Sequence, residues 1–211
     1  STISADFGDE VADTGLHVTT PGAPQVQAYL ARMVDAGLTH CILEMRSHGL
    51  AQGRLNGVDI DLAVLTNVMH EHLDFHGSWE NYRDAKAIMF RMLSTSYRKT
   101  GVLKVAVINA DDQSYDYFKG IPADKVISYG IQNPADYRAA DIQYQPDQTE
   151  FVVHDTSISM QLVGEFNISN TLATISVAHE LGIGWESIQA GIAAVEMISG
   201  RMQRIDEGQD F

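Results

Sequence analysis

The strongest constraint on the fold is a set of short apolar runs without polar alternation. Residues 39–45, 62–68 and 103–109 are rich in β-branched and aliphatic side chains, and residues 125–129 form a shorter run of the same kind. Strands that are apolar at nearly every position are covered on both faces, which is typical of a parallel sheet. The runs therefore predict a mostly parallel sheet.

Helical patterns separate these runs. Residues 23–36, 79–98, 168–181 and 187–195 carry apolar side chains at helical spacing, and Ser78 is the predicted N-cap of the second helix. Strands that alternate with helices predict an α/β fold with helices flanking the sheet.

Residues 141–163 have a different pattern. Polar and apolar side chains alternate there, and the turn sequences Pro146-Asp147 and Asp155-Thr156 interrupt the alternation. This pattern predicts a small antiparallel β appendage to the parallel sheet.

Composition excludes several classes of function. The 211 residues include 28 acidic and 14 basic side chains, a formal net charge of −14. This charge argues against nucleic acid or an anionic membrane as the main partner. The single cysteine, Cys41, excludes an internal disulfide. The sequence has no signal peptide and no apolar run near the roughly 20 residues of a membrane span, so a cytoplasmic protein is expected.

Four histidines, His48, His70, His72 and His76, fall close together in the sequence after two of the predicted strands. Ligands of open α/β sheets bind outside the carboxyl ends of the strands. We therefore expect one crevice to be lined by Glu44, Ser47, His48, Asn67 and His72.

The residue types alone leave several alternatives open. The histidines and carboxylates suit a metal or phosphate site, but they equally suit loop caps and surface positions, and the zinc-protease pattern His-Glu-x-x-His is absent. By its pattern Lys86 is an ordinary helix-surface lysine. Asn167 and Asn170 either cap a helix or present two amides to a ligand. The segment from Asn109 to Asp112 reads as a capped helix start.

Several motifs together resemble the Mur ligase family, in the order that the family has them. These motifs are Thr19-Thr20-Pro21, Glu44-x-x-Ser47-His48-Gly49-Leu50-x-Gln52-x-Arg54, Thr66-Asn67-x-x-x-x-His72-Leu73-Asp74-x-His76-Gly77, Ala85-Lys86, Asn109-Ala-Asp-Asp, Gly164-x-Phe-Asn167-x-x-Asn170 and Gly200-Arg201-Met202. The resemblance spans residues 19–211. The motifs resemble in particular those of the member that adds the third amino acid of the muropeptide, and the resemblance implies the family's P-loop-like central domain.

The resemblance implies an ATP-dependent ligase that acts in peptidoglycan precursor synthesis. A carboxylate of UDP-MurNAc-dipeptide would attack the γ-phosphate of ATP, and the amine of an amino acid would then displace phosphate from the acyl phosphate. Such phosphoryl transfer depends on positioning and charge neutralisation. Glu44 and His72 match the family's Mg²⁺ ligands, and Lys86 matches a lysine that is carbamylated and helps to hold Mg²⁺.

The resemblance also implies residues that bind substrate and nucleotide. Residues that match contacts to the UDP-muramoyl substrate are Thr19, Thr20, Ser47, Gln52 and Arg54. Residues that match the nucleotide site are Asn67, Asn167, Asn170 and Arg201.

The sequence departs from the family at two places. Arg46 stands where the family usually has a serine that contacts substrate, and His70-Glu71 replaces an Arg-Asp pair. These departures keep a second hypothesis open, a non-catalytic binding or regulatory relative. A third hypothesis is a metallohydrolase built on His70, His72 and His76.

No Gly-Lys-Ser/Thr occurs in the sequence, so the P-loop is missing. We therefore expect residues 1–211 to be the central ATP-binding domain alone. The UDP-binding N-terminal domain and the amino-acid-binding C-terminal domain would be absent, and the fragment would be inactive by itself.

Overall fold

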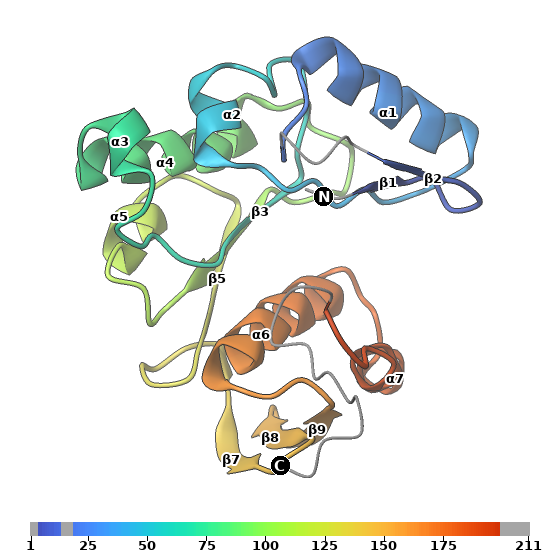
Figure 1. Ribbon diagram of the computed structural model, residues 1–211, viewed down its shortest axis with the longest axis vertical. Helices are drawn as coiled ribbons and strands as arrows, with labels where there is room; N and C mark the ends of the chain where they lie inside the picture. Colours follow the sequence, from blue (N-terminus) through green and yellow to red (C-terminus); the bar gives the residue numbers. More distant parts are fainter. Residues whose placement is uncertain (1–3, 14–18, 199–211) are drawn as a thin grey trace, which may run out of the picture. The chain divides into compact units, whose positions relative to one another are not determined.

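A computed structural model of the chain describes residues 4–13 and 19–198, and Figure 1 labels their helices and strands. One sheet has the strand order β3 (Leu62–Leu65), β4 (Val105–Asn109), β5 (Lys125–Gly130) and β6 (Tyr137–Arg138). Strands β5 and β6 pair in parallel. The predicted parallel sheet is confirmed, although β3 ends earlier than the apolar run that predicted it.

Four helices correspond to the four predicted helical patterns. They are α1 (Ala23–Asp35), α4 (Trp79–Thr95), α6 (Glu165–Glu180) and α7 (Trp185–Ala193). Ser78 caps α4 as predicted, because its Oγ accepts a hydrogen bond of 3.2 Å from the N–H of Asn81.

Two of the three shorter helices, α2 (Ser47–Ala51) and α3 (Leu73–His76), were not predicted. The third, α5 (Tyr115–Lys119), begins shortly after residues 109–112, which were predicted to be a capped helix start. Segments this short do not repeat a helical period often enough for the sequence pattern to reveal it.

The antiparallel appendage is also confirmed. It consists of β7 (Ala140–Tyr144), β8 (Thr149–Val153) and β9 (Thr156–Met160), paired in that order. His154 and Asp155 form the tight turn between β8 and β9 with φ angles of 48° and 60°. A further hairpin, β1 (Ser4–Asp6) with β2 (Val11–Asp13), was not predicted.

The predicted strand over residues 39–45 is wrong. This segment has no strand assignment and pairs with no strand among residues 4–13 and 19–198. Ile42 is 95% exposed and Cys41 is also exposed. Apolar, β-branched composition indicates a strand only where a neighbouring strand supplies hydrogen bonds, and composition does not reveal that neighbour.

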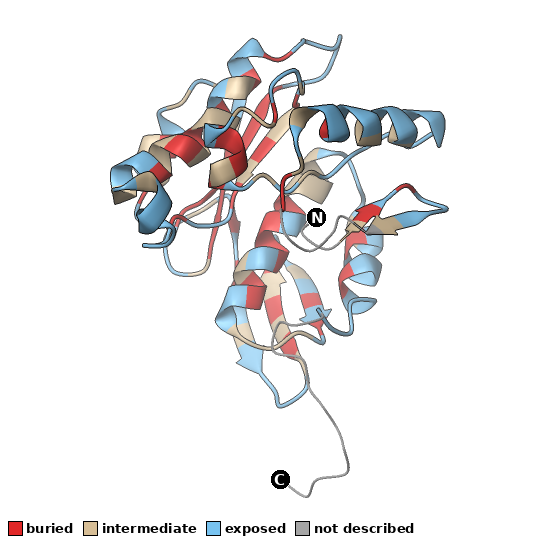
Figure 2. Cartoon of the chain, turned by 45° about the horizontal axis from the view of Figure 1, so that its top comes forward, coloured by how far each residue is buried: buried red, intermediate tan, exposed pale blue. Residues whose placement is uncertain are grey.

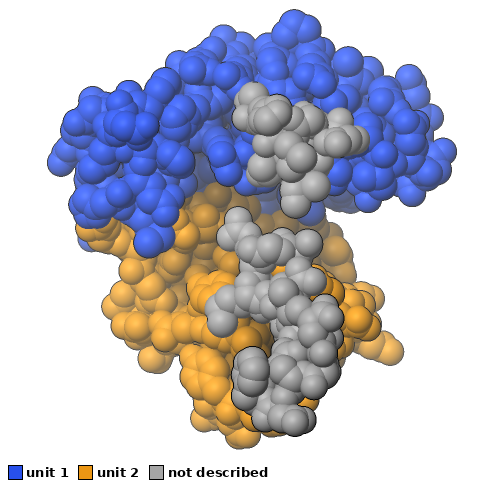
Figure 3. Space-filling view, viewed as in Figure 1, with its two compact units in different colours: residues 1–63, 68–106, 116–125 blue, residues 64–67, 107–115, 126–211 orange. Residues whose placement is uncertain are grey.

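The described residues form two compact units (Figure 3). The first comprises residues 1–63, 68–106 and 116–125, and the second comprises residues 64–67, 107–115 and 126–211, apart from the residues that the structure does not describe. Within the described ranges, no helix combines the length and the apolar character that crossing a membrane requires.

Part of the core of the first unit fixes the helices that carry candidate site residues. Val26 of α1 packs with Leu50 of α2 and with Leu55, and Ile88 and Met92 of α4 pack against this cluster. Figure 2 shows the buried residues in red. Helices α2 and α4 are therefore held against each other by apolar contacts, independently of any ligand.

Candidate functional site

Thr20 anchors the loop that carries Glu44. The Thr20 side chain is buried, and its hydroxyl donates to the carbonyl of Glu44 at 3.3 Å and accepts from the N–H of Arg46 at 3.2 Å. The carbonyl of Thr20 accepts a hydrogen bond of 2.9 Å from Nη1 of Arg54. In this structure Thr20 positions the neighbouring site residues, and a direct contact with substrate stays a prediction.

Gly49 makes this anchoring possible. A Cβ atom added at Gly49 would lie 2.7 Å from Cβ of Thr20, a distance that real Cβ atoms essentially never show. The close approach of α2 to Thr20 therefore requires glycine at this position.

Three of the four clustered histidines come together around α2 and α3. Nε2 of His76 lies 3.0 Å from Oγ of the buried Ser47. The ring of His48 lies 4.9 Å from that of His72, 5.3 Å from that of His76 and 4.1 Å from that of Phe75, between ring centroids. We call His48, His72 and His76 the histidine cluster. Ser47 contacts a histidine of this cluster in the structure, and its predicted binding of substrate stays a prediction.

His72 has an unusual backbone conformation. It precedes α3 with φ 58° and ψ 27°, in the left-handed region. This conformation costs a residue with a Cβ about 1–2 kcal/mol, and it is more common for histidine than for most other residues. Backbone strain of this kind collects at functional sites. The strain at His72 is therefore a second reason, besides the motif, to place His72 in the site.

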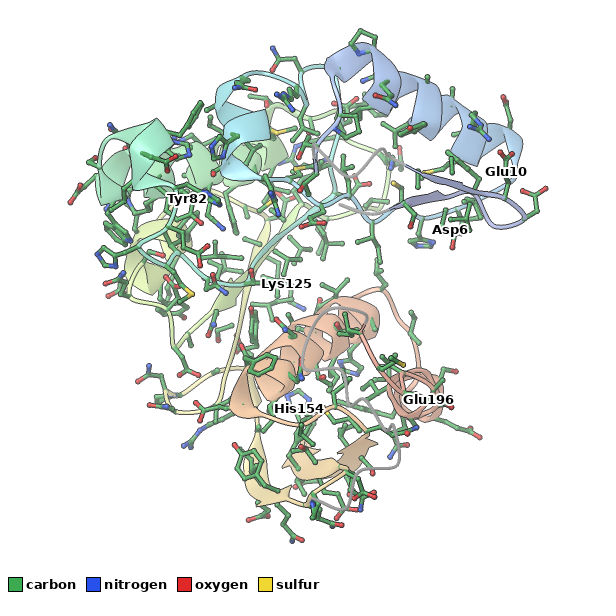
Figure 4. The ribbon with its side chains drawn as sticks, in the orientation of Figure 1. Asp6, Glu10, Tyr82, Lys125, His154 and Glu196 are labelled. Atoms are coloured by element: carbon green, nitrogen blue, oxygen red, sulfur yellow. The ribbon has the colours of Figure 1, made fainter. Side chains whose placement is uncertain are left out.

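Tyr82 links the histidine cluster to Lys86, and Figure 4 labels the Tyr82 side chain. The buried Tyr82 ring lies 6.0 Å from the ring of His72 and 5.4 Å from that of His76, between centroids. Nζ of Lys86 lies 5.2 Å from the same Tyr82 centroid. Tyr82 is absent from the residues predicted from the sequence. Its spacing of four residues before Lys86 in α4 is the one signal that could have indicated it.

The fourth histidine lies apart from the cluster. The ring of His70 stacks on Trp79 with 6.0 Å between centroids, and the guanidinium of Arg83 lies 5.4 Å from the Trp79 centroid. Within the described part of the chain, no three His, Cys, Asp or Glu side chains form a group that could hold a metal ion. The hypothesis of a metallohydrolase built on His70, His72 and His76 therefore has no support in the structure.

Burial and neighbouring charges lower the pKa of two clustered histidines. Burial is the largest cause for His48, the charge of His72 adds to it, and Arg46 and Arg54 lower this pKa further against an opposing effect of Asp74. Burial also lowers the pKa of His76, together with the charges of His48 and His72. Both imidazoles are therefore neutral near pH 7 and can accept hydrogen bonds.

The chemistry of the donor set fits Mg²⁺. Glu44 is exposed and offers a carboxylate, and the exposed His72 offers an imidazole. Mg²⁺ is held in nucleotide sites by one or two protein ligands, with water and phosphate oxygens completing its shell. Lys86, which is partly exposed, is a cation and would become a ligand only after conversion to a carbamate.

The residues predicted to bind nucleotide belong to the second unit, where the structure describes them. Asn67 is exposed directly after β3. Asn167 is buried in the first turn of α6, and its Nδ2 donates a hydrogen bond of 2.8 Å to the carbonyl of Val163. Asn170 is exposed on the same helix, and Gly164, not an asparagine, is the N-cap. The alternative that these asparagines cap the helix is therefore wrong.

Three further predicted residues complete the set. Thr19 is buried beside Thr20, and Gln52 is exposed at the C-terminal end of α2. Arg201 lies outside the described residues.

Asp111 has a structural function that the sequence pattern missed. Its carboxylate accepts hydrogen bonds from the N–H groups of Ile131 at 2.6 Å, Gln132 at 3.2 Å and Asn133 at 2.8 Å. The loop after β5 thus folds around the carboxylate of Asp111, which accepts hydrogen bonds from three of its backbone N–H groups. The carboxylate of Asp112 accepts a hydrogen bond of 2.9 Å from the N–H of Ser114, just before α5.

Comparisons with known proteins identify the family. Residues 2–178 match the family described as the Mur ligase middle domain. The UDP-N-acetylmuramoyl-L-alanyl-D-glutamate–2,6-diaminopimelate ligase of Geobacillus thermodenitrificans is 38% identical over 197 residues, which are 92% of this chain and 40% of that protein. The ligase of the same name from Bacillus licheniformis is 36% identical over the same shares.

Solved structures agree with the sequence comparison. A structure of a ligase with this name is 34% identical, has a TM-score of 0.76, and matches 96% of this chain and 42% of its own. The MurF ligase of Thermotoga maritima in complex with ADP shares the fold at 21% identity, with a TM-score of 0.61 over 90% of this chain and 44% of that one.

The sheet, its helices and the matched residues are those of a Mur ligase middle domain. The chain belongs to the Mur ligase family. It spans about two-fifths of the length of the curated relatives that it matches, since 40% of each of those two proteins is covered.

Proposed function

We propose that this chain is the central ATP-binding and Mg²⁺-binding domain of a ligase that adds an amino acid to UDP-MurNAc-dipeptide through an acyl phosphate. The observation that carries this proposal is the meeting of Lys86 and His72 at the ring of Tyr82. A lysine beside an imidazole that is proposed to bind Mg²⁺ is suited to act as a further ligand after carbamylation. A lysine on an ordinary helix surface would have no metal site to complete.

Each residue of the proposed site has a distinct task. Mg²⁺, when bound, would neutralise charge on the triphosphate and on the attacking carboxylate. Glu44 and His72 would hold it, and the carbamate of Lys86 would add negative charge to the same site. The Thr20 anchor fixes the backbone on both sides of Met45, so Glu44 needs little reorganisation to bind the ion.

The complete reaction needs parts that these 211 residues do not supply. We propose that a longer protein contributes the P-loop, the UDP-binding domain and the domain that binds the amino acid, and that residues 1–211 alone do not turn over. Diaminopimelate is the first amino acid to test, because it is named for the relatives that match most of this chain. ATP and nucleotide-activated sugars place the reaction in the cytoplasm.

Replacement of Lys86 tests the proposal. In the full-length protein, we expect Lys86→Ala to abolish release of ADP that depends on muropeptide and amino acid, because the site loses its carbamate. Added formate or acetate should restore part of the activity by occupying the carbamate position. The matched control is Lys119→Ala, a change of another exposed lysine in the first unit, which should leave the rate unchanged.

Two results would contradict the proposal. Normal turnover in Lys86→Ala would exclude the carbamate function. Wild-type full-length protein that releases no ADP with any muropeptide would instead favour the second candidate, a non-catalytic relative. That candidate is supported by the two departures from the family pattern, Arg46 and His70.

A further inference from the structure

Arg46 differs from the other arginines that the structure describes. The guanidinium groups of the others donate to a carboxylate, a hydroxyl or a backbone carbonyl, as seen for Arg32, Arg54, Arg83, Arg91, Arg98 and Arg138. The exposed guanidinium of Arg46 has no hydrogen bond or ion pair with any residue in the ranges 4–13 and 19–198. It is therefore available to an external anion.

The backbone of Arg46 is nevertheless fixed. Its N–H donates to Oγ1 of Thr20 at 3.2 Å, and the carbonyl of the same threonine holds Nη1 of Arg54 at 2.9 Å. One buried residue thus anchors the backbone of one arginine and the side chain of the other. The charges of both arginines also lower the pKa of His48, after the larger effect of its burial, so both act at the same ring.

The positive charges of two arginines thus act on one imidazole ring in a chain with a net charge of −14. A guanidinium recognises a carboxylate through paired N–H donors, and it stays charged at every physiological pH. A serine at this position, as the Mur ligase resemblance leads one to expect, would offer a neutral hydroxyl. Arg46 therefore adds both reach and charge to the segment that begins at Glu44.

We propose that Arg46 binds the carboxylate of the substrate's D-glutamyl group that does not react, and that it thereby selects substrates in which this carboxylate is free. The inference rests on the proposed function, because that function supplies a substrate with two glutamyl carboxylates, of which one becomes the acyl phosphate. Arg46 belongs to the first unit, as do Thr20 and Arg54, which are expected to contact the muropeptide, whereas the residues proposed to bind nucleotide belong to the second unit. This grouping favours the muropeptide over the nucleotide as the source of the anion. Arg46 is in this view a specificity-determining residue.

Steady-state kinetics of the full-length protein test the inference with two substrates. One is UDP-MurNAc-L-alanyl-D-glutamate, and the other carries an amide in place of the non-reacting carboxylate. For the first substrate, Arg46→Gln should raise KM about tenfold or more, because a charged hydrogen bond is lost, with kcat changed by less than about threefold and KM for ATP unchanged. Arg46→Lys should retain much of the affinity.

The amidated substrate provides the decisive comparison. Wild type should show a raised KM for the amidated substrate. Arg46→Gln should raise that KM by less than about twofold further, because this substrate already lacks the carboxylate that Arg46 would bind. Lys119→Gln, which removes an exposed positive charge elsewhere in the first unit, is the matched control and should leave both KM values unchanged.

Several outcomes would overturn the inference. An unchanged KM in Arg46→Gln would show that the guanidinium binds nothing. An equal rise in KM for both muropeptide substrates in Arg46→Gln would indicate that Arg46 binds the diphosphate. A rise confined to KM for ATP would indicate that it binds the nucleotide. A wild type without turnover would refute the proposed function first. Calorimetric binding of the two muropeptides to wild type and to Arg46→Gln would then still decide the function of Arg46.

Discussion

The buried Lys104 gives the most demanding test of how this fold is held together. Lys104 is 0% exposed, and its Nζ donates to the carbonyls of Ile60 at 2.6 Å and Tyr97 at 2.7 Å, and to Oδ1 of Asp61 at 2.9 Å. These bonds use all three donors of an ammonium group. Lys104 therefore ties the residues before β3 and after α4 to the start of β4.

We expect Lys104→Met to lower the free energy of unfolding by about 3 kcal/mol. Methionine retains length and apolar contacts, but the buried carbonyl of Ile60 and the partly buried carbonyl of Tyr97 lose their donor, and each such loss costs about 1–3 kcal/mol. Loss of the ion pair with Asp61 contributes less to this destabilisation than loss of the bonds to the carbonyls, because the Asp61 side chain is 23% exposed and also binds Lys99 at 2.6 Å. Asp61→Asn should cost about 2 kcal/mol, because the buried ammonium then lacks a counter-charge.

Urea unfolding monitored by circular dichroism measures these changes, and the double variant measures their coupling. Because both single variants break the same ion pair, the double variant should be less destabilised than the sum by about 1 kcal/mol or more. If the free energy of unfolding of Lys104→Met lies within about 0.5 kcal/mol of the wild-type value, the hydrogen bonds at Nζ do not stabilise the fold and the reasoning is refuted.

The same pair makes a prediction about pH. Burial, the largest single effect, would raise the pKa of Asp61, but hydrogen bonds and charges from Lys99 and Lys104 outweigh it, and the pKa lies below its ordinary value. The stability gained from ionised Asp61 is therefore present above the ordinary aspartate pKa and is lost as the pH falls through the lower folded value. The difference in stability between wild type and Asp61→Asn should shrink in that acidic range. A difference that stays constant down to full protonation would contradict this account.

Two further substitutions test local features by thermal unfolding. Gly49→Ala should destabilise the fold by about 1–3 kcal/mol, because the new methyl group collides with Thr20. The control Gly191→Ala, in the open surface of α7, should stabilise it by about 0.5–1 kcal/mol. Equal effects of the two substitutions on stability would argue against the close contact at Gly49. Asp111→Ala should destabilise by about 2 kcal/mol through loss of the loop after β5, while the exposed control Asp147→Ala should stay within about 0.5 kcal/mol of wild type. A neutral Asp111→Ala would mean that this loop holds its shape without the carboxylate.

Elements whose signal is local were predictable from the sequence. Helix α4 follows from its apolar period and from the cap at Ser78, and the hairpin of β8 and β9 follows from alternation around the turn at His154 and Asp155. In both cases the residues that determine the conformation lie within a few positions of one another. The conformation of residues 39–45 depends on distant partners, which a local pattern does not reveal, and the strand predicted there is wrong.

The candidate site was predictable in its chemistry and less so in its contacts. The order of the motifs indicated the family, and the structure brings His48 and His72 together as expected, with His76 as a third histidine that was not predicted to lie beside His48. The hydrogen bond that removes Ser47 from solvent was not predictable, because its partner His76 lies on another helix. Tyr82 was not predicted as a site residue, because a tyrosine on an amphipathic helix is usually part of the core.

The backbone at His72 restricts how this position can evolve. Besides glycine, asparagine, aspartate and histidine are the residues that adopt the left-handed conformation most readily, and β-branched residues are nearly excluded. Each of the three non-glycine choices carries an atom that can coordinate a metal. Apart from glycine, the residues that genetic drift most readily introduces at position 72 are thus potential ligands, and the turn before α3 favours a metal-binding option even in sequences where selection for the reaction has relaxed.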